Sequence, residues 1–197
     1  AVSQHVFALI LHFTNHVAIH NDAVQNGDWV KCPDFCFWNK NLQELTGKTL
    51  GIFGYGNIGK KVAQIGLAFG MKVICCTRTA KEGMPEQVSF DELLKQSDFI
   101  SLHAPLTDKT KNLINTETLK LIKPSAYLIN TARGGFIDEQ ALKEALNKGK
   151  LAGYAGDVIS EEPMKAQNPL LGAKNCIITP HIAWAPLETR TRLQGIA

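Results

Sequence analysis

Five polar side chains that could do acid–base and anion-binding chemistry follow apolar segments of this 197-residue chain, directly or within a short loop. They are His103, Arg133, Asp157, Glu162 and His181. An arginine guanidinium can hold a carboxylate through paired hydrogen bonds and orient a neighbouring carbonyl. A histidine can give or take a proton near neutral pH, and an adjacent carboxylate favours the charged imidazole. Arg133, Glu162 and His181 are therefore the candidate catalytic residues.

Each of these residues also has a structural explanation. Arg133 could form a surface ion pair, and Glu162 could be a solvated loop acid. Asp157 could cap a helix or turn, and His181 could be a hydrogen-bonded structural histidine. His103 is equally compatible with the wall of a pocket and with no functional role. The chemistry requires a fold that brings the residues together.

A glycine pattern earlier in the chain indicates what such a fold would bind. The apolar run 49–53 leads directly into Gly54-Tyr55-Gly56-Asn57-Ile58-Gly59, and a helical segment follows. The first glycine permits a tight turn, the second lets the backbone approach phosphates, and the third lets the helix lie close to the strand. A plain tight turn is the alternative, but strand–turn–helix is the order that a dinucleotide pyrophosphate needs. The predicted cofactor contacts here are Gly54, Gly56, Asn57, Ile58 and Gly59.

Strand-like and helix-like segments alternate along the rest of the chain. Strands are predicted at 49–53, 72–76, 98–102, 126–130, 152–156 and 176–179. Helices are predicted at 57–69, 89–96, 116–121 and 138–147, the last beginning at Asp138. This alternation predicts an α/β fold of the Rossmann type, with a doubly wound parallel sheet and helices on both faces.

The carboxyl ends of parallel strands meet at one edge of a sheet, where ligands bind. We therefore expect the candidate residues to crowd one rim. Asp157 could accept a hydrogen bond from the amide of a nicotinamide. The remaining predicted cofactor contacts are Thr77, Arg78, His103, Ala104, Pro105, Thr131, Ala132, Arg133, Asp157 and His181.

The end of the second predicted strand bears on the type of cofactor. An acid that binds the ribose hydroxyls is expected there, but Thr77 and Arg78 occupy the position. An arginine beside small hydroxyl residues suits a 2′-phosphate and favours NADP(H) slightly. Thr77 would also tolerate NAD(H), so the cofactor is predicted to be NAD or NADP.

Composition excludes several other classes of protein. The net charge of +3 is too small, and the basic residues too scattered, to indicate a nucleic-acid partner. No apolar run approaches the length of a membrane span, and no signal peptide is recognisable. Five cysteines, two of them adjacent in an apparent buried strand, argue for a reducing, cytoplasmic setting. Cys32 and Cys36 lack the second pair that a zinc site needs, so no metal is expected.

The N-terminal segment has apolar residues at helical spacing, which predicts one long amphipathic helix over residues 2–26 that ends at Asn26-Gly27. His12, His16 and His20 share another stripe, which fits a polar helix face or a partner contact better than a metal site. The aromatic loop 29–38 is typical of a satellite core or an interface.

Five segments together resemble, in order and spacing, the motifs of the D-isomer-specific 2-hydroxyacid dehydrogenases: GIFGYGNIG, SLHAPLT, INTARGG, GDVISEEP and TPHIAWA. The resemblance covers nearly the whole chain. It implies an Arg–Glu–His catalytic set at Arg133, Glu162 and His181, with Asp157 contacting the nicotinamide. The DFCFW loop and Trp184 look most like glycerate dehydrogenases, also called hydroxypyruvate reductases. The implied reaction is hydride transfer between a nicotinamide cofactor and a small D-2-hydroxy acid or 2-oxo acid.

The resemblance also implies a domain organisation. Residues 1–197 look like the dinucleotide-binding domain alone, with 1–27 as an interdomain-type helix and 187–197 as the start of a return helix. We expect the substrate-binding domain to be absent from this piece, and therefore expect poor turnover from it, because closure of two lobes normally excludes water. The family resemblance suggests a homodimer through the N-terminal helix and the aromatic loop. Two alternatives stay open: another 2-oxo acid such as glyoxylate, pyruvate or a phosphorylated acid, and a nucleotide-sensing scaffold like the corepressors that share the fold.

Overall fold

The predicted alternation of strands and helices is present in the computed structural model, which describes residues 1–79 and 83–195. Seven strands form one sheet in the order β3-β2-β1-β4-β5-β6-β7, and every neighbouring pair is parallel. The strands are β1 (Thr49–Phe53), β2 (Lys72–Cys76), β3 (Glu86–Gln87), β4 (Phe99–Leu102), β5 (Tyr127–Asn130), β6 (Gly153–Gly156) and β7 (Cys176–Ile178). The α/β Rossmann-type prediction is confirmed, and the chain order changes direction between β1 and β4.

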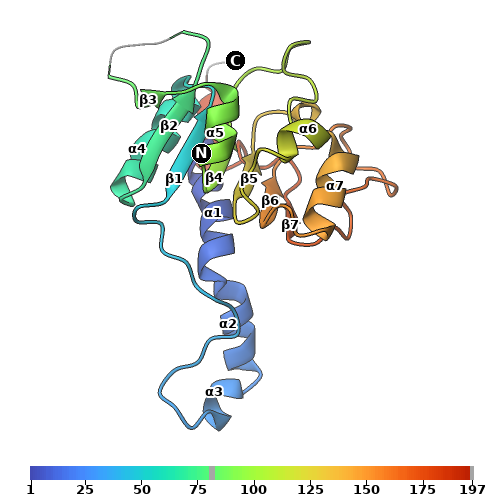
Figure 1. Cartoon of the computed structure of the whole chain (residues 1–197). Helices are drawn as coiled ribbons and strands as arrows, with labels where there is room; N and C mark the ends of the chain where they lie inside the picture. The colour runs from blue at the N-terminus through green and yellow to red at the C-terminus, as the bar shows by residue number, and fades with distance from the viewer. Residues whose placement is uncertain (80–82, 196–197) are drawn as a thin grey trace.

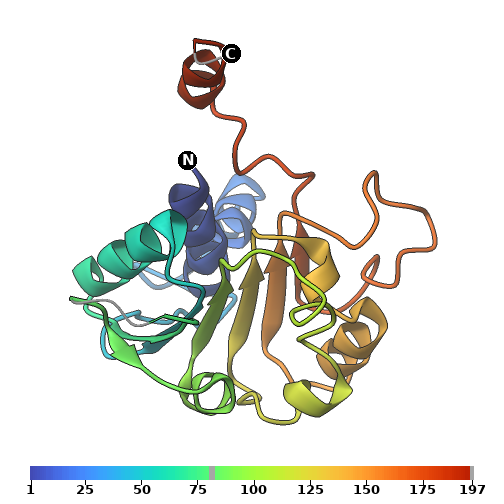
Figure 2. The same ribbon diagram turned by 90° about the horizontal axis from the view of Figure 1, so that it is seen from above.

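Helices cover both faces of this sheet (Figures 1 and 2). The helices of the first face are α1 (Val2–Asn15) and α4 (Asn57–Ala68). Those of the second face are α5 (Phe90–Gln96), α6 (Thr116–Leu119) and α7 (Glu139–Asn147), with the short 3-10 helix η1 (Gly134–Phe136) before α7. Their ends carry expected caps: the side chain of Asp138 accepts the backbone N–H of Ala141 at 3.0 Å, which confirms the predicted start of α7.

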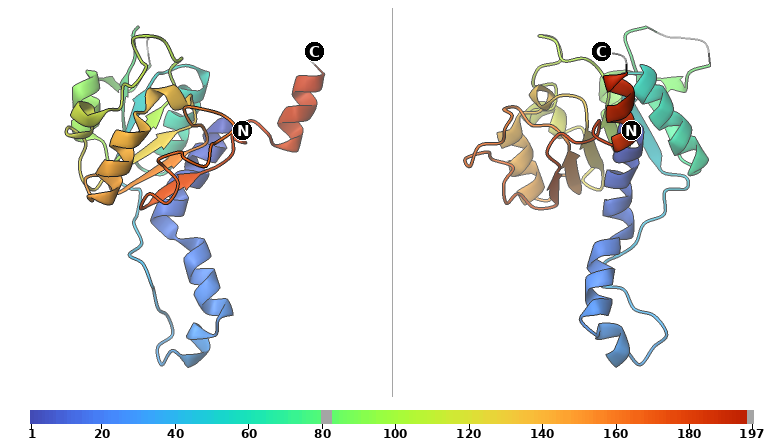
Figure 3. Two further views of the ribbon diagram at one scale, coloured as in Figure 1. Left: turned by 90° about the vertical axis from the view of Figure 1, so that its right-hand side faces the viewer. Right: turned by 180° about the vertical axis from the view of Figure 1, so that it is seen from behind.

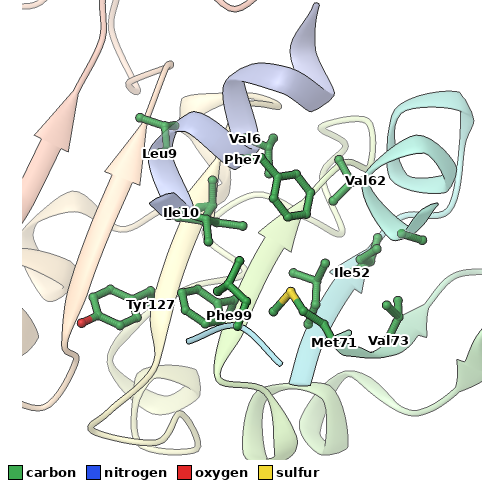
Figure 4. Close-up of a cluster of buried hydrophobic side chains, with 14 of the residues drawn as sticks. Val6, Phe7, Leu9, Ile10, Ile52, Val62, Met71, Val73, Phe99 and Tyr127 are labelled. Atoms are coloured by element: carbon green, nitrogen blue, oxygen red, sulfur yellow. The ribbon is translucent and has the colours of Figure 1, made fainter. Parts of the chain in front are cut away.

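Alternate residues of the strands fill two separate cores. On β5, Tyr127 and Ile129 belong to the cluster under α1 and α4, whereas Leu128 belongs to the cluster under α5 to α7. This alternation is what the pleat of a strand buried on both faces requires. Figure 4 shows how the first cluster joins α1 to the sheet: Phe7 and Ile10 of the helix point toward the strand residues. The N-terminal helix is thereby anchored beneath the middle of the sheet.

The predicted single helix over 2–26 is wrong at one residue. His16 has φ 48° and ψ 37°, a left-handed conformation that ends α1 and precedes α2 (Val17–Gln25). Just before it, the hydroxyl of Thr14 bonds the carbonyl of Ile10 and the side chain of Asn15, which competes with the helical pattern. The predicted end at Asn26-Gly27 is confirmed, because Gly27 has φ 83° and precedes α3 (Asp28–Lys31).

The segment from α2 to residue 42 forms an arm that projects from the body of the molecule (Figures 1 and 3). We call residues 17–42 the arm. It runs outward through α2 and α3 and returns as an extended segment to β1. At the other end of the chain, α8 (Leu187–Gln194) also stands away from the body, and none of its side chains is buried (Figure 3). The last two residues of the predicted 187–197 helix lie outside the described residues.

Candidate active site

The carboxyl ends of β1, β4, β5, β6 and β7 form one continuous rim, because these strands are parallel and adjacent. In this order across the sheet, the glycine turn, His103, the segment 131–133, Asp157 and His181 follow them. The rim includes the point between β1 and β4 where the chain order reverses, which is where open α/β sheets bind ligands. Thr77 and Arg78 follow β2, on the other side of the glycine turn.

The glycine turn has the geometry that a dinucleotide requires. Gly54 has φ +94°, and a Cβ there would lie 2.6 Å from the backbone nitrogen of Ala104. A Cβ on Gly59 would lie 2.2 Å from the carbonyl oxygen of Gly54, so the helix start is pressed against the turn. At Gly56, by contrast, a Cβ would meet no atom of the described residues within 4 Å. The open backbone at Gly56, directly before the first turn of α4, leaves room for a phosphate.

A second observation at the rim also fits a bound cofactor. The hydroxyl oxygen of Thr131 is buried and has no hydrogen-bond partner among the described residues. Such orphaned polar atoms are rare in folded proteins, because leaving one unpaired costs about 1–3 kcal/mol. A polar ligand at the end of β5 would supply the missing partner.

His103 lies between the glycine turn and the end of β5 as an uncharged residue. Burial lowers the pKa of His103 to about 4, so its imidazole is neutral at physiological pH. Its Nε2 lies 2.8 Å from the hydroxyl oxygen of Ser101, which is fully buried in β4. The backbone of His103 and Ala104 packs against Gly54. His103 is therefore part of the wall of the rim and cannot act as a cation there.

Glu162 and His181 are in direct contact, as their predicted pairing requires. The Nδ1 atom of His181 lies 2.7 Å from Oε2 of Glu162, and both side chains are partly exposed. The other carboxylate oxygen of Glu162 accepts the backbone N–H of Ile159 at 3.2 Å, which fixes the acid on its loop. With Nδ1 engaged, Nε2 is the ring nitrogen directed away from Glu162. This is the arrangement of a histidine oriented for proton transfer at Nε2.

Arg133 lies on the loop after β5, which packs against the loop after β6. Gly134 packs so closely on the loop after β6 that a Cβ would lie 1.8 Å from the carbonyl carbon of Ile159. The guanidinium of Arg133 is exposed, and its Nη1 donates to the carbonyl of Ala132 at 2.6 Å. The structure thus joins the loops that carry Arg133 and Glu162, while the side-chain contact it forms is between Glu162 and His181.

Two buried polar residues that hold these loops were not predicted from the sequence. Asn130, fully buried, donates to the carbonyl of Arg133 at 2.9 Å and accepts the N–H of Ala132 at 3.0 Å. Glu139, also buried, accepts the N–H of Ser160 at 2.7 Å. The available signal was a polar residue in an otherwise buried segment, since such residues need internal partners.

Asp157 is more deeply enclosed than its predicted nicotinamide contact suggests. Its side chain is 1% exposed, and both oxygens already accept hydrogen bonds within the chain. The donors are the hydroxyl of Thr179 and the backbone N–H groups of Ile182 and Ala183. The contact between Asp157 and a nicotinamide stays a prediction, and the structure adds a second role: Asp157 fixes the segment that carries His181.

Thr77 and Arg78 end β2 near the solvent. The carbonyl of Thr77 accepts the side-chain amide of Gln87 at 3.0 Å, and the side chain of Arg78 is exposed. An exposed guanidinium at this position can reach an added phosphate on a ribose without losing an existing ion pair among those described.

In residues 1–79 and 83–195, no group of three or more His, Cys, Asp or Glu side chains could hold a metal ion. The ring of His20 bonds the carbonyl of His16 at 2.9 Å and accepts the N–H of Asn39 at 3.2 Å, so it is a structural residue of the arm. In the same part of the chain, no helix combines the length and apolar character that crossing a membrane requires.

Comparison with known proteins identifies the family. The model of the D-isomer specific 2-hydroxyacid dehydrogenase NAD-binding domain matches residues 7–183. The chain belongs to this family. It is 47% identical over 201 residues to a hydroxypyruvate reductase of Blautia hydrogenotrophica, covering 100% of this chain and 62% of that protein. It is 43% identical over 189 residues to a glycerate dehydrogenase of Methylorubrum extorquens, covering 95% of this chain and 59% of that protein.

Solved structures agree with this family. A D-lactate dehydrogenase from Aquifex aeolicus, complexed with NAD and lactic acid, superposes with a TM-score of 0.88 at 37% identity. The match covers 99% of this chain and 63% of that one. The chain therefore spans about three fifths of the length of its relatives and corresponds to their NAD-binding domain.

Proposed function

We propose that this chain is the cofactor domain of a longer D-2-hydroxyacid dehydrogenase that interconverts hydroxypyruvate and D-glycerate. The observation that carries the proposal is the 2.7 Å contact between Glu162 and His181 at the rim that begins with the glycine turn. The names of the similar hydroxypyruvate reductase and glycerate dehydrogenase support this substrate pair. The second lobe would lie in the rest of the parent protein.

In the proposed mechanism, each residue has a separate task. The glycine turn would hold the pyrophosphate of a nicotinamide cofactor, which would supply the hydride when bound. Arg133 binds the carboxylate of the 2-oxo acid and polarises its C2 carbonyl. His181 donates a proton from Nε2 to the carbonyl oxygen as C2 is reduced. Glu162 holds the imidazole by Nδ1 and balances the positive charge of its protonated form.

The test is a spectrophotometric assay of the parent protein with hydroxypyruvate and each reduced cofactor. We expect turnover with hydroxypyruvate at a higher kcat/KM than with glyoxylate or pyruvate. A higher value with either competitor would replace the substrate and leave the reaction type intact. No turnover with any 2-oxo acid, together with cofactor binding, would instead favour a nucleotide-sensing role.

For the cofactor, we propose NADPH as the preferred reductant, on the basis of Thr77 and Arg78 at the end of β2. Replacing Arg78 by Ala should weaken NADPH binding by about 1.5–3 kcal/mol, the range for a hydrogen bond to a charged group. NADH binding should not change. Fluorescence titration of the chain itself measures both affinities, with Lys109→Ala on the β4–α6 connection as a control. Equal losses for the two cofactors would contradict recognition of a 2′-phosphate by Arg78.

We further propose that two copies of the chain form a dimer through the arm, in a reducing compartment such as the cytoplasm. Val30 and Phe35 are each 89% exposed and Trp38 is 65% exposed, which is unusual for side chains of this size. An arm that stands clear of its own body can pack on an identical partner around a two-fold axis. All five cysteines are free thiols, which suits a reducing setting.

A further inference from the structure

His5 is a polar residue on the side of α1 that packs against the sheet. Its neighbours Val6, Leu9 and Ile10 are buried in the core that joins α1 to the strands (Figure 4). The imidazole itself is only 20% exposed. A half-buried histidine in an apolar interface needs polar partners to offset the loss of water. Its partners lie 174 residues away in the sequence.

These partners belong to the segment that follows β7. The Nε2 atom of His5 lies 3.0 Å from the hydroxyl oxygen of Thr179 and 3.5 Å from Oδ1 of Asp157. The hydroxyl of Thr179 donates to the same carboxylate oxygen. A hydroxyl has one proton, so Thr179 must accept from His5, and Nε2 of His5 must carry a hydrogen. The bonds therefore run in one direction, from His5 to Thr179 to Asp157.

Asp157 in turn holds the backbone of the residues that follow His181. Its Oδ1 accepts the N–H of Ile182 at 2.9 Å and its Oδ2 accepts the N–H of Ala183 at 2.7 Å. His181 itself has φ 54°, a left-handed conformation that costs a non-glycine residue about 1–2 kcal/mol. Such a conformation persists only when surrounding contacts impose it. The carboxylate of Asp157 supplies these contacts on the C-terminal side of His181.

We infer that His5 is a positioning residue, which holds the segment Thr179–Ala183 through Thr179 and Asp157 and so fixes the imidazole of His181 beside Glu162. The inference rests on the proposed function for its catalytic consequence and extends it to a residue of α1 that lies 174 residues before Thr179 in the sequence. It also makes α1 part of the active-site architecture, since α1 carries His5 and is anchored in the core beneath the sheet.

Backbone amide hydrogen exchange of this chain, followed by NMR, tests the positioning without any substrate. In His5→Ala, the amides of Ile182 and Ala183 should exchange about tenfold faster, the factor expected for the loss of one net hydrogen bond. The amide of Thr179, which donates to Gly156 between β7 and β6, should keep its rate. His5→Gln, whose amide can still donate to Thr179, should restore most of the protection. His12→Ala, an exposed histidine of the same helix, is the matched control.

Two results would overturn the inference. Unchanged exchange of Ile182 and Ala183 in His5→Ala would show that Asp157 holds the segment without help. Equal acceleration of all amides would show that His5 contributes only to global stability. The consequence for turnover is measured in the parent protein, where His5→Ala should lower kcat about tenfold at constant KM for the cofactor. If the unmodified parent has no turnover, the proposed function fails, while the exchange result still decides the positioning.

Discussion

The rim and the arm of this molecule differ in the surroundings of their side chains: rim side chains form contacts within the chain, whereas large apolar side chains of the arm are exposed. At the rim, Asp157 is 1% exposed and has three donors within the chain, and Glu162 bonds both His181 and a backbone N–H. In the arm, Val30 and Phe35 are 89% exposed. The rim is therefore organised by contacts within this chain, apart from the orphaned hydroxyl of Thr131. The apolar surface of the arm is left uncovered by the described residues of this chain.

The same difference appears in the hollows of the surface. The arm carries an open groove of about 590 Å³ whose lining includes Val17, Val24, Trp29 and Trp38. Covering such an apolar groove with a partner displaces water, which favours association by about 25 cal/mol for each Å² buried. The rim presents single polar atoms instead, which select a ligand by hydrogen bonding. This difference supports the proposed roles of the two regions, which are ligand binding at the rim and association through the arm.

The largest effect is expected from a substitution that removes a side chain of the rim and leaves the arm intact. Replacing His181 by Ala in the parent protein removes the proposed proton donor, so kcat should fall about 10²–10⁴-fold. The cofactor should still bind, because the glycine turn is intact, and the oligomeric state should not change, because the arm lies elsewhere. Steady-state kinetics and sedimentation measure these properties. His12→Ala serves as the control, and a kcat within twofold of the unmodified protein would remove His181 from the mechanism.

A charge placed in the arm should do the reverse. In Trp38→Asp, a carboxylate would enter the apolar surface, and the dimer Kd should rise by at least about thirtyfold, equivalent to about 2 kcal/mol. Cofactor binding to the monomer should persist, because the rim is formed within one chain. Light scattering over a concentration series gives the Kd. Leu187→Asp is the control, since Leu187 is 67% exposed on α8, outside the arm. Equal effects of the two substitutions would refute the arm as the interface.

The sequence predicts the strands and the rim residues more accurately than the N-terminal helix that leads into the arm. Six strands were predicted within one residue at each end, because β-branched and apolar runs of that length are buried on both faces. The seventh strand, β3, was missed because its two residues are exposed and carry no apolar signal. The rim residues were found because parallel strands end at one edge. The helix break at His16 was not, because apolar spacing continues across a single left-handed residue.

The hydrogen-bond partners of the site residues could not be predicted from the sequence, for a physical reason. Asp157 was predicted to face a cofactor, but Thr179 and His5 meet it only through tertiary packing. Asn130 was placed at the end of a strand, with no indication that its side chain folds the Arg133 loop back on itself. Period and spacing report which face of an element is buried. They do not report which hydrogen-bond partners a buried polar group acquires.

Acid pH should distinguish the buried polar interior from the exposed arm. Burial holds the pKa of His103 at about 4, whereas the pKa of a histidine in the unfolded chain is about 6.5. As the pH falls, the unfolded chain therefore takes up this proton first, and stability present above pH 6.5 is lost toward pH 4. At pH 5, the loss relative to pH 7 from this group is about 2 kcal/mol.

His103→Gln should remove that part of the pH dependence. Urea unfolding at pH 7 and pH 5 gives the free energy of unfolding for both proteins, and the variant should lose about 2 kcal/mol less than the original. His12→Gln, at an exposed histidine of α1, is the matched control for the substitution itself. Parallel losses in the original and in His103→Gln would mean that His103 is not the buried neutral group responsible.

The smallest effect is expected from a substitution in α7, the helix that follows the loop carrying Arg133. Asp138 caps α7 directly after the loop that carries Arg133, and Asp138→Ala should lower the free energy of unfolding by about 1 kcal/mol. Glu144→Gln on the same helix affects exposed contacts with Lys148 and Gln140, so about 0.5 kcal/mol or less is expected. Because the cap belongs to the body, the dimer Kd should stay constant in both variants. A parallel rise in Kd for Asp138→Ala would show that the rim and the arm form one cooperative unit, and the division of roles between them would have to be abandoned.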